Sequence, residues 1–354
     1  MFEIILIKDS LYWDQVVMSF KDHDVYYLSG YVKAFQVHGD GEPLLFYYHD
    51  AGLRGVCVFM KRDISMLPIY ASLLTPREYF DLVTPYGYGG FIFEGDTSQK
   101  TFHVFQEAFV ELLQREKIVS LFIRYHPQIE NARYLPSLFS PVDVGKTIEM
   151  DIRSPEVIWN NLTSKNRNMI RKAGKLGVSI CHGKGLQLFA VFKKIYNSTM
   201  DKDNASAYYY FEDQFYLSIN NDFASNHEIF YALYGGKIVA MSIMLYANQR
   251  MHYHLSGSFW EYRSLAASNL LLYEAACWGS QQGFKTFHLG GGLGAKEDGL
   301  FRFKQAFSRS QGRVFSVGKC VVNADVYAKL VKMRETYDKN FDMNSLFFPL
   351  YRGM

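Results

Sequence analysis

The same succession of secondary-structure signals occurs twice along this chain of 354 residues. Residues 43–61 and residues 228–246 each contain two β-rich runs around a glycine-containing turn, the pattern of a β-hairpin. Each hairpin is followed, some way on, by a loop, a helical pattern and a β-branched or aromatic strand. The repetition predicts two copies of one α/β unit. The alternative is a chance coincidence, because hairpins and helix–strand pairs are common.

The elements that follow each hairpin can be placed by their periodicity. In the first half, a helix is expected over residues 102–115 and a strand over 118–125. In the second half, a strand is expected over 251–256, a helix over 270–282 and a strand over 286–289. The predicted fold class is therefore α/β, with two tandem lobes that each hold a mixed, mostly antiparallel sheet flanked by helices.

The boundary between the lobes is marked by a helix start. Ser154 can cap the free amides of a helix, and Pro155 is tolerated at the first helical position. No low-complexity segment or flexible linker precedes this point. We therefore expect an N-terminal lobe over residues 1–150 and a C-terminal lobe, with the active site, over residues 151–354.

Charge and cysteine content exclude several classes of protein. The formal net charge is +3, from 38 basic and 35 acidic side chains, which is too balanced for a protein that coats nucleic acid. No DNA partner is expected, and any basic site must be confined to one part of the protein surface. The four cysteines include no CxxC pair, so neither a disulfide framework nor a thiolate zinc site is indicated.

The apolar segments are too short for a membrane span. The longest useful run, Ile238–Ala247, has about half of the roughly 20 residues that cross a bilayer. The N-terminus has neither the basic start nor the long apolar stretch of a secretory signal. We expect a soluble, cytoplasmic protein with at most peripheral membrane contact.

A basic segment begins the second lobe. Arg167, Arg171 and Lys175 are one helical turn apart and share a face, and Lys165 precedes them. Cations without acidic partners repel one another unless an anion joins them. The segment favours a substrate site for phosphates, such as those of a pyrophosphate-linked sugar or a tRNA backbone. The alternative is an ordinary solvated helix face.

A second candidate site lies where a helix begins after residue 268. Free backbone amides at a helix N-terminus bind phosphate oxygens when small residues allow the ligand to approach. Ala266 and Ser268 are small, and Arg263 could add further donors, so this loop is a candidate for binding the acyl donor. The alternative is a plain capped helix.

The third candidate is a glycine-rich segment after the last strand of the second lobe. Gly290, Gly291 and Gly292 leave the backbone bare, so that a ligand can approach it closely. We expect the phenylalanines that follow to anchor the segment in the core and to hold Lys304 at the edge of a pocket; they are Phe301, Phe303 and Phe307. A positioned ammonium could bind phosphate or stabilise an oxyanion. The alternative is a flexible turn with a surface lysine.

Candidate bases and walls of a site can also be named. His252 and His254 lie two apart on a strand and hence on one side, but no compact set of further ligands follows, so no metal is predicted. His254 and Asp298 are the candidate general bases. Tyr208 begins an aromatic run that could stack on a substrate, or that could simply pack in the core.

Taken together, these residues resemble the FemABX family, the peptidoglycan-bridge aminoacyltransferases, and related GNAT-fold N-acyltransferases of surface-polysaccharide pathways. The resemblance covers most of the chain. It is carried by Pro85–Gly90, by the basic segment Asn166–Lys175, by Gly290–Gly292 and by the pair Phe303-Lys304.

The resemblance implies two GNAT-like lobes, the second with the substrate site, and transfer of an acyl group from a thioester or aminoacyl ester to an amine. No tightly bound cofactor is implied; acyl-CoA or aminoacyl-tRNA would serve as co-substrate. The basic helix and Lys304 would hold the phosphates of a small-molecule or lipid-linked glycan precursor, which places the protein in cell-envelope biogenesis. For this, Arg167, Arg171 and Lys304 must converge on one pocket.

The departures from the family pattern separate three hypotheses. Members that use aminoacyl-tRNA often carry a long charged helical hairpin, which this chain lacks, so an acetyl-CoA-type donor is favoured. Ala266 and Ser268 stand where the GNAT pyrophosphate loop normally has glycines, which weakens the case for CoA. A tRNA-dependent aminoacyltransferase and a non-catalytic binder of an anionic glycan precursor are the alternatives.

Overall fold

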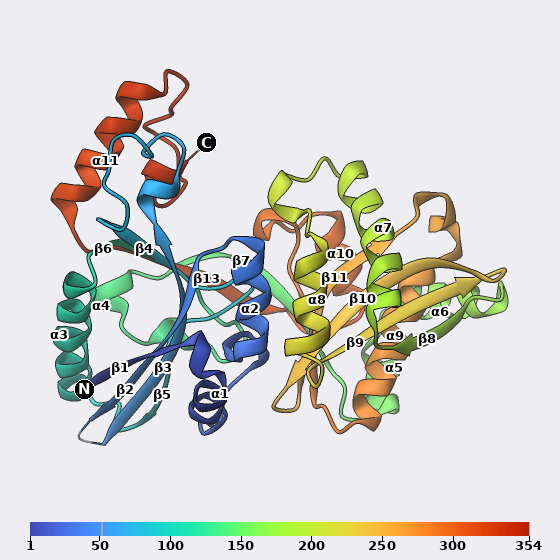
Figure 1. The fold of residues 1–354 in the computed structure, drawn as a ribbon. Helices are drawn as coiled ribbons and strands as arrows, with labels where there is room; N and C mark the ends of the chain where they lie inside the picture. Colours follow the sequence, from blue (N-terminus) through green and yellow to red (C-terminus); the bar gives the residue numbers. More distant parts are fainter. Residues whose placement is uncertain (51, 354) are drawn as a thin grey trace. The chain divides into compact units, whose positions relative to one another are not determined.

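A computed structural model describes residues 1–50 and 52–353 of the chain. The chain forms two compact units, each described here by itself (Figure 1). Unit 1 consists of Met1–Val144 together with Phe315–Met354, and unit 2 consists of Gly145–Val314. The prediction that all residues after 151 belong to the second lobe is therefore wrong for the end of the chain.

Unit 1 contains a sheet with one parallel pair of strands. Its order is β1 (Phe2–Leu6), β2 (Glu42–Asp50), β3 (Leu53–Asp63), β4 (Phe80–Val83), β6 (Ile118–Arg124) and β13 (Arg313–Val321), and β5 (Ile92–Gly95) pairs with β3. The β4–β6 pair is parallel, and the other neighbours are antiparallel.

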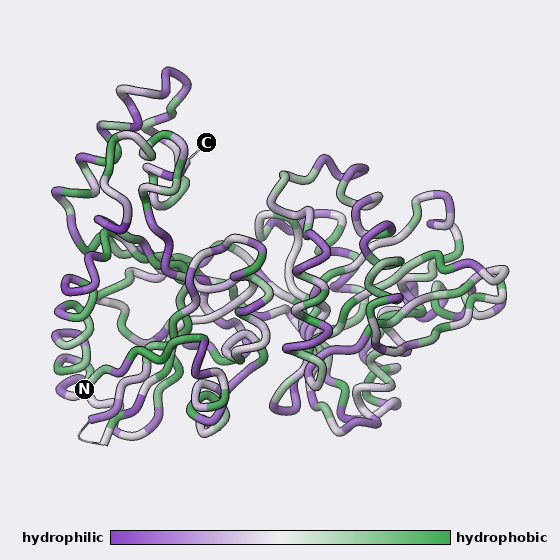
Figure 2. The backbone as a smooth tube through the Cα atoms, in the orientation of Figure 1, coloured by the Kyte–Doolittle hydropathy of each residue, from purple (hydrophilic) through white to green (hydrophobic). Residues whose placement is uncertain are grey.

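The helices of unit 1 include the one predicted over residues 102–115. They are α1 (Ser10–Met18), α2 (Ser29–His38), α3 (Gln99–Arg115), α4 (Pro136–Phe139) and α11 (Ala324–Tyr337). On α3, Phe105, Phe109 and Leu112 are buried at helical spacing against the sheet. The same helix, beside the N-terminus, alternates between hydrophobic and hydrophilic colour in Figure 2.

The end of the chain belongs to unit 1 because its polar and aromatic groups are buried there. Strand β13 pairs with β6, and the fully buried Tyr351 shares a hydrogen bond with Ser120. Arg352 donates to the buried carboxylate of Asp81, as does Arg62 from β3. The contacts of Tyr351 with Ser120 and of Arg352 with Asp81 join residues more than 200 positions apart, which no local pattern predicts.

Unit 2 repeats the strand order of unit 1. Its order is β7 (Val142–Asp151), β12 (Thr286–Gly290), β11 (Arg250–Ser258), β10 (Lys237–Ala247), β9 (His227–Tyr234) and β8 (Ser179–Gly183). Only β11–β12 is parallel. In each unit a hairpin leads into a parallel pair joined through one long helix, so the predicted duplication of one α/β unit is confirmed.

Helices cover both faces of the sheet of unit 2 (Figure 1). They are α5 (Pro155–Asn161), α6 (Ser164–Lys175), α7 (Leu186–Lys202), α8 (Asp213–Asp222), α9 (Ala267–Gln281) and α10 (Gly299–Gln305). Helices α5, α6 and α9 share one apolar core with the sheet, and α7 packs on β10 and β11. None of the helices in the described ranges combines the length and apolar character needed to cross a membrane.

Candidate active site

The candidate site of unit 2 lies where its two parallel strands stop pairing with each other. Strand β11 pairs with β12 only through Arg250–His252 and Thr286–His288. The residues beyond, Tyr253–Ser258 of β11 and Leu289–Gly290 of β12, form what we call the β11–β12 fork, because within the described chain they make no ladder with each other. Ligands of open α/β sheets bind at such carboxyl ends of parallel strands.

A β-bulge at His254 arranges the side chains of the fork. The register passes from Met244↔Tyr253 to Ile243↔Leu255, so that His254 is the extra residue. The shift lies next to Ser256, whose hydroxyl accepts a hydrogen bond from Ser242 of β10 at 3.1 Å. Burial raises the pKa of Tyr253, and the two serines oppose this rise. Bulges often re-aim side chains next to active sites.

Lys304 lies beside the fork and is almost completely buried. Its side chain is on α10 and is 8% exposed. The Nζ donates a hydrogen bond of 2.6 Å to the carbonyl of Gly291 and lies 5.8 Å from the centroid of the Tyr253 ring. Burial lowers the pKa of Lys304 to about 8, while Asp298 opposes the shift. At neutral pH the amine is thus mostly charged but close to its titration point.

Asp298 holds the loop in place. It is the N-cap of α10, and its Oδ1 accepts from the Phe301 amide at 2.8 Å while Oδ2 accepts from the Leu293 amide at 3.1 Å. These backbone hydrogen bonds lower the pKa of its carboxyl group. A carboxylate of lowered pKa is a poor base, so the geometry favours a positioning role over the predicted role of general base.

The glycines that follow β12 lie close to other parts of the same chain. A Cβ at Gly291 would lie 2.8 Å from the carbonyl oxygen of Lys146, and one at Gly292 would collide with Lys296 and Asp298. We expected bare backbone for a ligand. At Gly291 and Gly292, other segments of the same chain approach closely instead. A pattern of glycines in the sequence does not reveal where those segments lie.

His254 and Tyr208 have environments that the sequence did not indicate. Burial, together with the nearby His252, lowers the pKa of His254 to about 3. The imidazole is therefore neutral but very weakly basic, which disfavours it as a base at neutral pH. Tyr208 lies in a short 3-10 helix, Ala207–Tyr209, with 39% of its surface exposed and its ring edge-on to Tyr209. It does not pack in the core.

Two cations of α6, Arg167 and Arg171, contact residues at the end of α5. Arg167 donates to the carbonyls of Leu162, at 2.8 Å, and Trp159, at 3.3 Å, which are at the end of α5. The guanidinium of Arg171 lies 5.0 Å from the centroid of the Trp159 ring. Lys304 instead contacts Gly291 and Tyr253, so these contacts do not support the expected convergence of Arg167 and Arg171 with Lys304 on one pocket. Lys165 is exposed in the first turn.

Asn166 joins three helices. It is only 1% exposed; its Nδ2 donates to the Ala306 carbonyl at 3.2 Å, and its Oδ1 accepts from Asn269 at 2.8 Å. It therefore links α6 to the first turn of α9 and to the end of α10. The sequence analysis named Asn166 only as the start of the basic segment and missed this role. Its helical spacing with the buried Ile170 and Ala173 was the available signal.

The predicted donor loop adopts the conformation of a glycine loop without the glycine. Ala266, the N-cap of α9, has φ 54° and ψ 34° in the left-handed region and is buried. Glycine is the usual residue there because a Cβ costs roughly 1–2 kcal/mol. Alanine in place of glycine seemed to argue against donor binding, but the backbone at Ala266 keeps the left-handed conformation that glycine usually adopts. The guanidinium carbon of Arg263 lies 4.3 Å from the centroid of the Trp260 ring. Ser268 is half-buried in the first turn of α9.

Unit 1 fills the corresponding space with its own chain. After β4, the backbone stays on β6: Gly89 donates to the Arg124 carbonyl at 2.7 Å and accepts from His126 at 3.0 Å. Asn131 also donates to Gly89, and a Cβ at Gly87 would collide with the ring of Tyr26. The glycine-rich segment Pro85–Gly90 is therefore packed inside unit 1.

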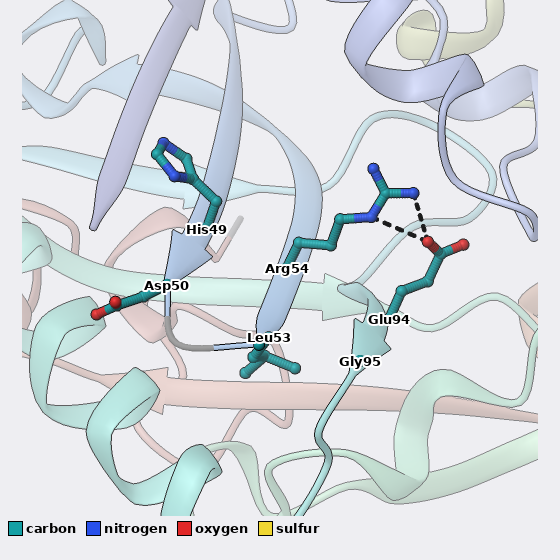
Figure 3. A pocket seen from close by; sticks show the side chains of 7 residues that line it. His49, Asp50, Leu53, Arg54, Glu94 and Gly95 are labelled. Atoms are coloured by element: carbon teal, nitrogen blue, oxygen red, sulfur yellow. Dashed lines mark hydrogen bonds and ion pairs between the residues drawn. The ribbon is translucent and has the colours of Figure 1, made fainter.

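Unit 1 also has a groove at the tip of the β2–β3 hairpin (Figure 3). It is lined by His49, Asp50, Leu53, Arg54 and Glu94, among others. The side chains of Arg54 and Glu94 point toward each other and form an ion pair at 2.5 Å (Figure 3). Because these charges satisfy each other, we assign no site to this groove.

Comparisons with known proteins agree with this fold. The acetyltransferase (GNAT) domain family matches residues 161–305, all within unit 2. The crystal structure of FemX superposes with a TM-score of 0.65 at 14% identity, covering 92% of this chain and 99% of that chain. A conserved protein of unknown function from Bacteroides thetaiotaomicron gives 0.57 at 13% identity, covering 90% of this chain and 99% of that one.

L-PGS from Bacillus licheniformis gives a TM-score of 0.53 at 12% identity, with 85% of this chain and 90% of that chain covered. Sequence comparison with the curated proteins finds no match, so these likenesses are likenesses of fold. Residues 161–305 match a GNAT-type acetyltransferase domain, which supports an acyltransferase, and the chain has the FemX-like fold expected from its motifs.

Proposed function

We propose that this protein transfers an acyl group from an acetyl-CoA-type thioester to an amine of a phosphate-bearing precursor of the cell envelope or of a surface polysaccharide. The GNAT-type domain supports the thioester donor. The observation that carries the proposal is the buried ammonium of Lys304, which lies beside Tyr253 and Gly291 at the β11–β12 fork.

The reaction needs little more than orientation and one positive charge. The unprotonated amine attacks the thioester carbonyl, so that a C–N bond forms and the carbonyl oxygen becomes an oxyanion. Lys304 stabilises this oxyanion, as a preorganised donor does in other acyl transfers. Collapse breaks the C–S bond, and the proton lost by the amine balances the one gained by the thiolate. Holding both substrates in line supplies much of the acceleration.

The acceptor is proposed to carry phosphate because α6 has exposed cations. Lys165, Arg171, Lys172 and Lys175 are exposed on this helix. Tyr208 is retained as a stacking residue for the acceptor because its ring is exposed. A lipid-linked acceptor would bring the protein to a membrane surface only peripherally. The cytoplasm is the proposed location, since acyl-CoA and aminoacyl-tRNA are made there.

An aminoacyl-tRNA donor is the second candidate. The likeness in fold to FemX and to L-PGS favours it. It requires the same chemistry, because an aminoacyl ester also presents a carbonyl to an attacking amine. The GNAT-type domain weighs against the third possibility, a binder without turnover.

The donor can be identified by turnover. We expect acetyl-CoA, with a panel of amino-sugar nucleotides, to release free thiol, and we expect acetyl-CoA to raise the melting temperature because it binds only the folded chain. Thiol release is measured by a colorimetric reagent and the melting temperature by thermal shift. Product formed only from aminoacyl-tRNA would select the second candidate. If neither donor is consumed, the proposal is wrong.

A further inference from the structure

The C-terminal segment of unit 1 presents large apolar side chains to solvent. It follows α11 and is drawn in red in Figure 1. Leu346 is 91% exposed, Phe347 is 55% exposed and Met343 is 45% exposed. We call these three residues the Leu346 tip. Single apolar residues are normal on a protein surface, but three within five consecutive positions form a cluster, and such clusters mark interaction sites.

The chain directly after the tip is packed against unit 1. The ring of Phe348, the neighbour of the exposed Phe347, stacks on the ring of Tyr327 with 6.0 Å between the centroids. It also lies 6.2 Å from the ring of Phe122 on β6. The Leu350 amide donates to the Tyr327 hydroxyl at 2.9 Å. The base of the tip is therefore fixed to the sheet and to α11, while the apolar side chains of the tip stay in solvent.

The backbone donors of the tip find their acceptors within the same segment. The Asn344 amide donates to Asp342 Oδ1 at 2.9 Å, and the Ser345 amide donates to the Asp342 carbonyl at 3.1 Å. The Phe347 amide donates to Ser345 Oγ at 3.2 Å. In lipid, where no water replaces a lost hydrogen bond, backbone groups must be satisfied by the protein itself. These amides can therefore leave water without losing their partners.

An exposed cation lies at the base of the tip, and a second lies behind it. The Nζ of Lys319, on β13, donates to the Leu346 carbonyl at 3.3 Å and lies 5.7 Å from the centroid of the Phe348 ring. The guanidinium carbon of the half-buried Arg124 lies 5.2 Å from the centroid of the Phe122 ring, which packs on Phe348. An apolar tip with cations at its base complements a bilayer that has acyl chains inside and anionic headgroups outside.

We propose that the Leu346 tip inserts its apolar side chains into the surface of a bilayer that contains anionic lipid, with Lys319 at the level of the headgroups. The inference deepens the proposed function and rests on it, because a lipid-linked acceptor lies at such a surface. The satisfied backbone favours lipid over a protein partner. A protein could itself supply hydrogen bonds to the tip, whereas acyl chains supply none.

The test measures binding of the full chain to vesicles by flotation. Vesicles of phosphatidylcholine mixed with phosphatidylglycerol should carry the wild type, and added salt should weaken this binding. Leu346→Ser/Phe347→Ser should lower the partition coefficient about tenfold or more, because two large apolar side chains no longer enter the bilayer. The melting temperature of this double variant should equal that of the wild type, since both side chains are exposed in the folded chain.

Leu11→Ser/Met18→Ser is the matched control. Both side chains lie on α1 of unit 1, where they are 83% and 54% exposed, so their replacement should not change vesicle binding. Lys319→Gln keeps a donor for the Leu346 carbonyl but removes the charge. It should weaken binding to the mixed vesicles roughly fivefold, the contribution of one lysine at an anionic surface, and leave the weaker binding to pure phosphatidylcholine unchanged.

The outcomes separate this inference from the proposed function. If Leu346→Ser/Phe347→Ser binds the mixed vesicles like the wild type, if the α1 control loses as much binding, or if the wild type floats with neither kind of vesicle, the inference is wrong. If sedimentation velocity shows a wild-type dimer that the double variant abolishes, and no vesicle is bound, the tip contacts a second copy and the lipid assignment fails. The flotation assay contains no acyl donor. A wild type that binds vesicles but transfers no acyl group therefore overturns the proposed function alone.

Discussion

Lys304 combines an ordinary side chain with an unusual environment. The flanking Phe301 and Phe307 are buried in the core and carry the amine with them. Burial removes water from the ammonium, and the Gly291 carbonyl, a neutral acceptor, replaces only part of that hydration. The pKa therefore falls from its usual value to about 8. The same environment would strengthen the interaction of the ammonium with an oxyanion, because little water screens it.

The pH dependence of turnover should reveal this amine. Because the folded pKa is about 8, the charge is present below this pH and is lost as the pH rises through it. We expect the kcat/KM of the wild type, divided by that of Lys304→Arg, to fall above pH 8, since arginine stays charged. Lys304→Met should lose roughly 10²–10³ in kcat, as other enzymes do without one oxyanion donor.

Lys296→Met is the matched control, because Lys296 is exposed in the loop that precedes α10. Its profile should coincide with that of the wild type. If the wild type and Lys304→Arg show the same profile across pH 7 to 9, Lys304 does not act through its charge.

At the scale of elements, the beginning of α6 is a junction. Thr163 caps the helix and its amide donates to Ala306, while Asn166 hydrogen-bonds with both Ala306 and Asn269. The first turn of α9 and the segment that carries Lys304 are therefore held by one buried amide. Arg167 of α6 donates to the Leu162 carbonyl at the end of α5, and the guanidinium of Arg171 lies over the Trp159 ring.

Asn166→Ala should destabilise unit 2 by about 1–3 kcal/mol, because the half-buried Asn269 amide loses its acceptor and the Ala306 carbonyl keeps only the Thr163 amide as donor. Asn168→Ala, on the exposed face of the same helix, should lie within about 0.5 kcal/mol of the wild type. Chemical denaturation followed by hydrogen exchange of α9 measures both. Equal stability of the two variants would show that the junction is not a determinant of stability.

At the scale of the whole molecule, the last residues complete the first unit. Burial disfavours ionisation of Asp81, yet Arg62 and Arg352 outweigh it and lower the pKa of the carboxyl group. The tail thus supplies one of the two guanidinium groups that keep a buried carboxylate charged. The stability from this arrangement is present above the ordinary pKa of aspartate, about 3.9, and is lost as the pH falls below it.

Arg352→Ala should lower the stability of unit 1 by about 2–4 kcal/mol, because a buried charge loses one of its partners. Hydrogen exchange should accelerate in β4 and β6 while β9 and β10 keep their protection. Lys339→Ala, an exposed cation of the same tail, is the control. Uniform acceleration in both units would contradict this local role.

The architecture follows largely from local patterns. The hairpins, α3, α9 and the repeated order of elements were predicted because alternation, helical spacing and glycine turns are properties of neighbouring residues. The aromatic anchoring of Lys304 belongs to the same class, since Phe301, Phe303 and Phe307 lie within one short segment. The family resemblance likewise depended on motifs that are contiguous in the sequence.

The partners of the charged and polar groups were decided by tertiary structure. Arg167 looked like a ligand-binding residue, but it donates to the Leu162 carbonyl at the end of the preceding helix, and Asn166 donates to the distant Ala306 carbonyl. The bulge at His254 and the exposure of Trp260 depend on which strands and helices lie beside them. Sequence periodicity reports which face of an element is apolar, whereas a polar group's partner depends on segments up to hundreds of residues away. The sequence therefore determined the α/β duplication, and only the folded chain decided which cations remain for a substrate.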